Sequence, residues 1–215
     1  MKNIVLASAS PRRKELLEKT GLSFEIVVSD CDENIDVKEP NRLVMELSKL
    51  KAMDVSRKCA DSIIIGADTV VSFNGTIMGK PKSKEDAVEM IESFAGHTHQ
   101  VYTGICLIVP GEKSISHDSE LEKEISQMAE NCDVYYYNDK CIINYCVRTD
   151  VDVVEITEKE IIRYVETGEP MDKAGAYAIQ GLFAPYISSI KGDYYNVVGL
   201  PVCSLFHCLK LFMDE

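Results

Sequence analysis

Two adjacent arginines near the N-terminus occupy positions that call for a chemical explanation. Ser10 is predicted to be the N-cap of a helix and Pro11 its first residue, which puts Arg12 and Arg13 in the first turn. The helix dipole favours acidic side chains there. A bound phosphate would explain the two cations, because backbone N–H groups at a helix start and guanidinium groups both bind it. We therefore predict a phosphate site in the segment that begins at Ser8; the alternative is two solvated surface arginines.

Carboxylates in two other segments could bind a metal ion. Asp68 lies in the apolar, β-branched run 63–71, where a buried carboxylate is costly unless it is paired or binds a cation. Glu33 belongs to an acidic loop, 30–36, that could supply a second oxygen ligand. Two carboxylates with water and substrate oxygens suit Mg²⁺ or Mn²⁺, which seldom has an all-protein cage. The alternatives are a structural aspartate at Asp68 and an ordinary solvated loop around Glu33.

Two lysines and one glutamine are weaker candidates when each is taken alone. Lys51 lies towards the apolar stripe of its predicted helix, where a snorkelling lysine is the common explanation. Lys80 follows a hairpin and could be an ordinary loop lysine. The segment 172–181 combines small and polar residues, which is typical of a backbone that approaches a ligand closely. Within it, Gln180 could contact a base edge or could be satisfied by the backbone.

The elements that must position these side chains open in the order strand, turn, helix. Apolar alternation and β-branched runs predict strands at 2–8, 24–28, 63–71, 100–109 and 141–154. Caps and apolar stripes predict helices at 11–19, 41–58, about 83–96, about 157–168, and from 201 onwards. The polar, charged stretch at about 111–139 interrupts this order, and we predict that it is a surface insertion with a helix-like segment at 119–130.

Composition limits the classes of protein to which the chain can belong. Its 215 residues are 46% hydrophobic, so we expect one globular domain spanning 1–215. The net charge of -12 argues against a nucleic-acid partner and requires a local basic cluster or a metal for any phosphate ligand. The absence of a membrane span and of a signal-peptide pattern predicts a cytoplasmic protein.

Cysteine and histidine residues give no pattern of a metal site. The eight cysteines contain no CxxC spacing, and we predict reduced, mostly buried thiols. His97 and His99 lack a nearby third ligand, so structural or surface roles are predicted for both.

Six segments together resemble the Maf family of nucleoside triphosphate pyrophosphatases. They occur in the family's order and cover nearly the whole chain. The segments are SASPRRKELL at 8–17, GADTVV at 66–71, GKP at 79–81, GHTHQVYTG at 96–104, GEPMDKAGAY at 168–177 and GDYYNVVGLP at 192–201. Six motifs in this order make the resemblance highly specific.

The resemblance implies a fold and a reaction. The implied fold is α/β, of the Maf/ITPase-like kind: a mixed twisted sheet flanked by helices, elongated into two lobes with a central cleft. The implied reaction is cleavage of a nucleoside triphosphate to the monophosphate and pyrophosphate, with Mg²⁺ or Mn²⁺ as cofactor. The substrate would be the main partner, with no nucleic acid and no membrane, and a homodimer is compatible with it.

The resemblance also implies roles for individual residues. Glu33 and Asp68 match the carboxylates at the metal and the attacking water, and Asp68 the proton acceptor. Arg12, Thr69 and Gln180 match positions associated with preference for dTTP and UTP. The implied triphosphate-binding cations are Arg12, Arg13, Lys51 and Lys80.

Two departures from the family pattern and two rival functions remain. The insertion is longer than the usual connection, and Ala178 replaces a more frequent glycine. One rival is a non-catalytic nucleotide-binding regulator of cell division and septum formation. The other is a phosphatase that removes only the terminal phosphate. Identification of the released product separates all three functions.

Overall fold

The computed structural model describes residues 2–111, 123 and 125–213, and its central feature is an eight-stranded mixed sheet. The strands are β1 (Ile4–Leu6), β2 (Glu25–Ile26), β3 (Ile63–Phe73), β4 (Thr76–Met78), β5 (Thr98–Pro110), β6 (Asn131–Tyr137), β7 (Lys140–Val153) and β8 (Ile187–Lys191). Their order is β2-β1-β3-β5-β7-β6, with β4 paired to β3 and β8 paired to β7. β1 runs parallel to β2 and β3, and the remaining pairs are antiparallel.

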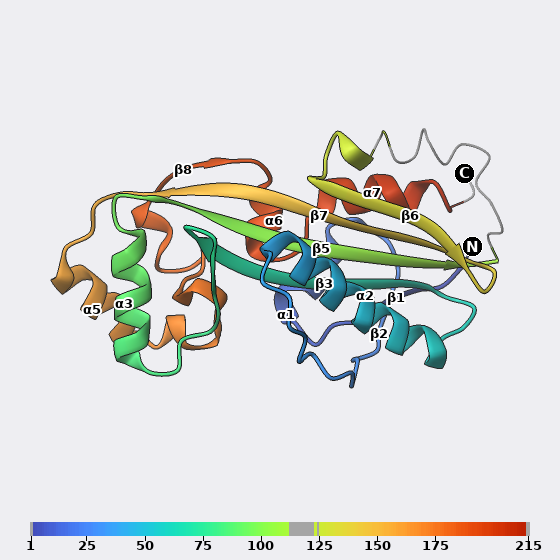
Figure 1. Cartoon of the computed structure of the whole chain (residues 1–215), viewed down its shortest axis with the longest axis horizontal. Coiled ribbons are helices and arrows are strands. Elements are labelled where there is room, and N and C mark those ends of the chain that lie inside the picture. The colour runs from blue at the N-terminus through green and yellow to red at the C-terminus, as the bar shows by residue number, and fades with distance from the viewer. Residues whose placement is uncertain (1, 112–122, 124, 214–215) are drawn as a thin grey trace.

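Helices and 3₁₀ turns lie along the length of the long strands. They are α1 (Pro11–Glu18), α2 (Pro40–Lys58), α3 (Lys84–Phe94), α5 (Glu158–Glu166), α6 (Tyr194–Val198) and α7 (Val202–Lys210), with 3₁₀ turns η1 (Glu169–Asp172), η2 (Ala174–Ala176) and η3 (Ala184–Tyr186). Figure 1 shows β3, β5 and β7 running the length of an elongated molecule, with α3 and α5 at one end, α1 and α6 near the middle, and α2 and α7 along the other half. This arrangement confirms the predicted mixed sheet flanked by helices.

Both faces of the central strands are buried, and alternate residues pack into different clusters. On β5, Ile105 and Leu107 join the larger core together with α7, whereas Cys106 and Ile108 pack with residues of α2 on the opposite face. Successive side chains of a strand point to opposite faces, so a continuous apolar run is what a sheet covered on both sides requires.

Two glycines allow α2 to lie directly against the sheet. A Cβ atom added to Gly66 on β3 would lie 2.1 Å from the backbone oxygen of Ser48, and one added to Gly104 on β5 would lie 2.2 Å from that of Val44. Only residues without a side chain fit at such a close approach. The contact brings Lys51, on the next turn of α2, within reach of β3.

We expect Gly66→Ala to lower the free energy of unfolding by about 1–3 kcal/mol, because the added methyl group forces α2 away from the sheet. Chemical denaturation would measure this change. Gly79→Ala is a matched control, since a Cβ there meets no atom within 4 Å. Equal stability of the two variants would contradict the close packing described here.

The predicted caps are confirmed by the geometry at three helix starts. The Oγ atom of Ser10 accepts from the backbone N–H of Arg13, and that of Ser83 accepts from Asp86. At Thr157 the backbone N–H donates to Glu160 at 2.9 Å, as in a capping box.

The last part of the predicted surface insertion at 111–139 is a strand, which was not predicted. It forms β6, which pairs along its whole length with the first half of β7. No residue of β6 is fully buried, although Cys132, Val134 and Tyr136 pack against the main core from alternate positions of the strand. Of the helix expected at 119–130, positions 119–122 and 124 lie outside the described residues, residues 123, 125 and 126 are helical, and residues 127–130 are not. β8 and α6, which carry few buried residues, were not predicted either.

Two further expectations from composition can be compared with the described residues. None of the helices in this part of the chain combines the length and the apolarity that a bilayer span requires. The eight cysteines are present as thiols and not in disulfides, and four of them are buried.

Candidate active site

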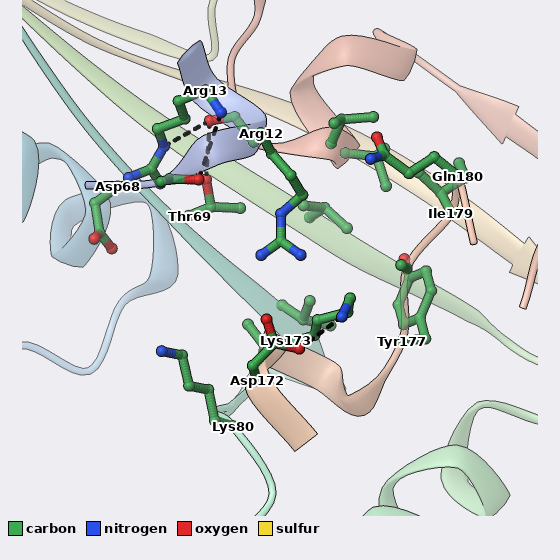
Figure 2. Close-up of a pocket in the computed structure, with 18 of the residues that line it drawn as sticks. Arg12, Arg13, Asp68, Thr69, Lys80, Asp172, Lys173, Tyr177, Ile179 and Gln180 are labelled. Atoms are coloured by element: carbon green, nitrogen blue, oxygen red, sulfur yellow. Dashed lines mark hydrogen bonds and ion pairs between the residues drawn. The ribbon is translucent and has the colours of Figure 1, made fainter. Parts of the chain in front are cut away.

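A cleft of about 360 Å³ opens beside the middle of β3 and collects most of the predicted site residues. Its walls come from the start of α1, from α2 and β3, from the loop after β4, and from the segment that runs through η1 and η2 (Figure 2). Eight of the nine predicted residues line it: Arg12, Arg13, Glu33, Lys51, Asp68, Thr69, Lys80 and Gln180. Ser8 is buried behind this wall.

Arg13 is held by neutral groups of the protein. Its Nε donates to the Gly199 carbonyl at 2.9 Å, Nη2 to Thr69 Oγ1 at 3.0 Å and Nη1 to Ser8 Oγ at 3.3 Å. Burial lowers the pKa of Arg13, while the charge of Asp68 raises it. A guanidinium has five N–H donors, so two remain for a ligand. Ser8 therefore positions Arg13 in this structure rather than facing the cleft.

Arg12 and Lys80 are two cations of the cleft that have no protein partner among the described residues. Figure 2 shows their charged groups pointing into the cleft from opposite sides. Within the described part of the chain, neither makes a hydrogen bond or an ion pair with the protein. Two unpaired cations facing one cavity can bind an anion without first breaking a protein contact.

Lys51 lies between the two predicted metal-binding carboxylates. Its Nζ atom is 2.6 Å from Asp68 Oδ1 and 2.8 Å from Glu33 Oε2. The side chains of Lys51 and Asp68 are only 12% and 13% exposed, whereas that of Glu33 is 54% exposed. Asp68 is thus largely shielded from solvent, and its ion-pair partner is a lysine from α2.

The donor set at Glu33 and Asp68 fits a hard divalent cation. Among the described residues, no three side chains of His, Cys, Asp or Glu are grouped so that they could hold a metal by themselves. Mg²⁺ and Mn²⁺ accept one or two protein carboxylates and complete their coordination with water and phosphate oxygens. A site of this kind would therefore be complete only with a phosphate ligand present.

A buried network behind Thr69 was not predicted. The Thr69 hydroxyl lies 3.0 Å from that of Thr103 on β5, which donates at 3.0 Å to the Asn196 carbonyl of α6. Asn196 is anchored in turn, because its amide donates to Val101 O and to Thr149 Oγ1. The sequence did mark Thr103 and Asn196, because they belong to the motifs at 96–104 and 192–201.

The wall opposite α1 is formed by the segment 172–181, as the sequence predicts. Gln180 is exposed, and Ile179 and Tyr177 lie next to it along the same wall (Figure 2). The Tyr177 hydroxyl lies 2.7 Å from Nε2 of the buried His99, whose ring stacks on Phe94 with a centroid separation of 4.4 Å. His99 is thus a structural residue that fixes Tyr177, as predicted for a histidine without further ligands.

Burial lowers the pKa of His99 to about 4, from 6.5, with Asp152 acting weakly in the opposite direction. Between pH 6.5 and about 4, His99 binds a proton in the unfolded chain but stays neutral in the folded chain. The free energy of unfolding therefore decreases as the pH falls through this range. We expect the free energy of unfolding to decrease by about 2 kcal/mol more in wild type than in His99→Gln between about pH 7 and about pH 5. Denaturation at both pH values measures this difference, and parallel losses would contradict a buried neutral imidazole.

Comparison of the whole chain with known proteins identifies its family. A model of the family described as Maf-like protein matches residues 3–212. The chain is 40% identical over 213 residues to a dTTP/UTP pyrophosphatase of Lachnoclostridium phytofermentans, covering 99% of this chain and 96% of that protein. It is 42% identical to proteins of the same name from Bacillus cereus (strain G9842), with the same coverage, and from Agathobacter rectalis, over 98% of this chain and 97% of that protein.

Proposed function

The chain belongs to the family described as Maf-like protein, and from this premise we propose that it is a nucleoside triphosphate pyrophosphatase acting on dTTP and UTP. The products are the nucleoside monophosphate and pyrophosphate. The observation that carries the proposal is one cleft in which the unpaired cations Arg12 and Lys80 face the Glu33–Lys51–Asp68 cluster. In this arrangement the cations can bind the triphosphate, and a carboxylate can accept a proton.

In the proposed reaction a water molecule attacks the α-phosphorus in line with the bond to the β-phosphate. The water oxygen forms the new bond to the α-phosphorus, and Asp68 accepts the proton. The bond from the α-phosphorus to the bridging oxygen breaks, and its electron pair leaves with pyrophosphate. Arg12, Lys80 and the remaining donors of Arg13 stabilise the charge that develops on this leaving group.

Glu33 and Asp68 are the residues that would hold a divalent metal. When bound, Mg²⁺ or Mn²⁺ would supply positive charge against the phosphate oxygens and acidify the attacking water. Lys51, which already contacts both carboxylates, keeps them together and has one N–H donor left for a phosphate oxygen.

The base of the nucleotide is proposed to lie against the wall that carries Gln180. Its exposed amide can both donate and accept hydrogen bonds, which suits the edge of thymine or uracil. Thr69 supports this selection through Arg13, which it holds at the cleft. A cytosolic location is part of the same proposal, supported by the eight cysteine thiols.

A product assay tests the proposed function. The purified protein is incubated with a panel of ordinary and modified nucleoside triphosphates and Mg²⁺ or Mn²⁺, and the released phosphates are separated. We expect pyrophosphate and monophosphate, formed fastest from dTTP and UTP. Orthophosphate would indicate a terminal phosphatase, and binding without any product would indicate a non-catalytic regulator.

A further inference from the structure

Asp172, at the end of η1, adds a negative charge to the wall of the cleft opposite α1. Its side chain is 72% exposed, and the residue lines the cleft. Figure 2 shows it between Lys80 and Tyr177, below the guanidinium of Arg12. A carboxylate here repels the phosphates of the proposed substrate but can accept a hydrogen bond from a neutral part of it.

Neighbouring groups fix the direction of this carboxylate. The Nζ atom of Lys173 donates to Asp172 Oδ1 at 2.6 Å and to the Glu169 carbonyl at 2.8 Å. The hydrogen bond from Lys173 lowers the pKa of Asp172, and the nearby charge of Arg12 lowers it further. The group is therefore ionised and oriented, and an ionised carboxylate has about four lone-pair positions, enough to accept from a ligand as well.

The position of Asp172 along the cleft indicates which hydrogen-bond donor of the substrate would face it. Arg12 and Lys80 mark the phosphate end, and Ile179 and Gln180 mark the base end. In a nucleotide, the sugar lies between these two parts. Its hydroxyl groups are neutral donors, and the one that dTTP and UTP share is the 3′-hydroxyl.

We propose that Asp172 accepts a hydrogen bond from the 3′-hydroxyl of the nucleotide sugar, and that Lys173 is the positioning residue for this carboxylate. The proposal rests on the proposed function and adds the sugar to the parts of the substrate that the cleft recognises. The site would then accept deoxyribose and ribose alike but discriminate against 3′-deoxy sugars.

The test compares kcat/KM for dTTP and for 3′-deoxythymidine triphosphate in wild type and in Asp172→Ala. Hydrogen bonds to charged groups lead us to expect that wild type prefers dTTP by roughly tenfold to a hundredfold. Asp172→Ala should lose most of this preference by slowing with dTTP, whereas its rate with the 3′-deoxy compound should not fall, because that compound has no 3′-hydroxyl to lose as a partner. Asp172→Asn, which keeps an uncharged acceptor, should lie between the two.

Other outcomes overturn the proposal and are distinguishable from failure of the proposed function. A variant that loses activity equally on both nucleotides would show a structural role or a contact to the base. A wild type that hydrolyses both nucleotides equally well would show that the 3′-hydroxyl is not recognised. No hydrolysis of any triphosphate by wild type would instead refute the proposed function.

Two further variants complete the experiment. Lys173→Met should weaken the preference for dTTP in the same direction as Asp172→Ala, because it frees the carboxylate to turn away; an unchanged preference would refute the positioning role. Glu166→Gln, an exposed acidic residue of α5, is the matched control and should retain the full preference.

Discussion

Replacing Asp68 with Asn is expected to lower kcat for dTTP hydrolysis by about a hundredfold or more. The substitution keeps the shape of the side chain and an oxygen that can accept from Lys51, but it removes the negative charge and the capacity to take a proton. The buried strand that carries Asp68 should remain folded, because the pair is replaced by a hydrogen bond. Steady-state kinetics measures the rate, and chemical denaturation measures the stability.

A matched substitution separates this effect from a general loss of charge. Asp61→Asn changes an exposed aspartate just before β3 and should leave the rate within about twofold of wild type. If Asp68→Asn hydrolysed dTTP nearly as fast as this control, Asp68 could not be the proton acceptor. A loss of activity accompanied by unfolding would be apparent from the denaturation curve.

Arg12→Gln is expected to lower kcat/KM for dTTP by about tenfold to a thousandfold without changing the free energy of unfolding. Within the described residues Arg12 makes no hydrogen bond or ion pair, so its removal leaves no protein group without a partner. The effect on activity arises because an unpaired guanidinium facing the cleft is free to bind phosphate. Enzyme kinetics and denaturation on the same preparation measure both quantities.

Two comparison variants make this prediction specific. Arg163→Gln removes an exposed arginine from α5 and should change neither quantity. Arg13→Gln should lower the stability as well as the activity, because Arg13 bonds to Ser8, Thr69 and Gly199. Wild-type activity in Arg12→Gln would exclude this residue from the phosphate grip.

The elements that could be predicted from the sequence are those specified by local patterns. The N-cap at Ser10 follows from residue types that are adjacent in the chain, and α2 follows from the spacing of its apolar residues. The partial burial of Asp68 follows from the β-branched run around it. β6 and β8 have no fully buried residue and form because β7 offers them an edge, which no local pattern records.

The arrangement of the site depends on contacts between distant segments. Lys51 reaches Asp68 because α2 packs closely on β3 at Gly66, a contact between two elements that the sequence does not place together. The same reason explains why the Ser8 hydroxyl accepts from the guanidinium of Arg13, a contact that was not predicted. Only the folded structure shows which of these cations are already hydrogen-bonded to the protein and which are free to bind a ligand.

The most direct test of the central claim is hydrolysis of dTTP in water enriched in ¹⁸O, followed by mass spectrometry of both products. Attack of water at the α-phosphorus predicts ¹⁸O in dTMP and unlabelled pyrophosphate. Label in pyrophosphate would place the attack at the β-phosphorus, and labelled orthophosphate beside dTDP would place it at the γ-phosphorus. Either of these results would contradict the reaction proposed for the cleft between Arg12 and Asp68.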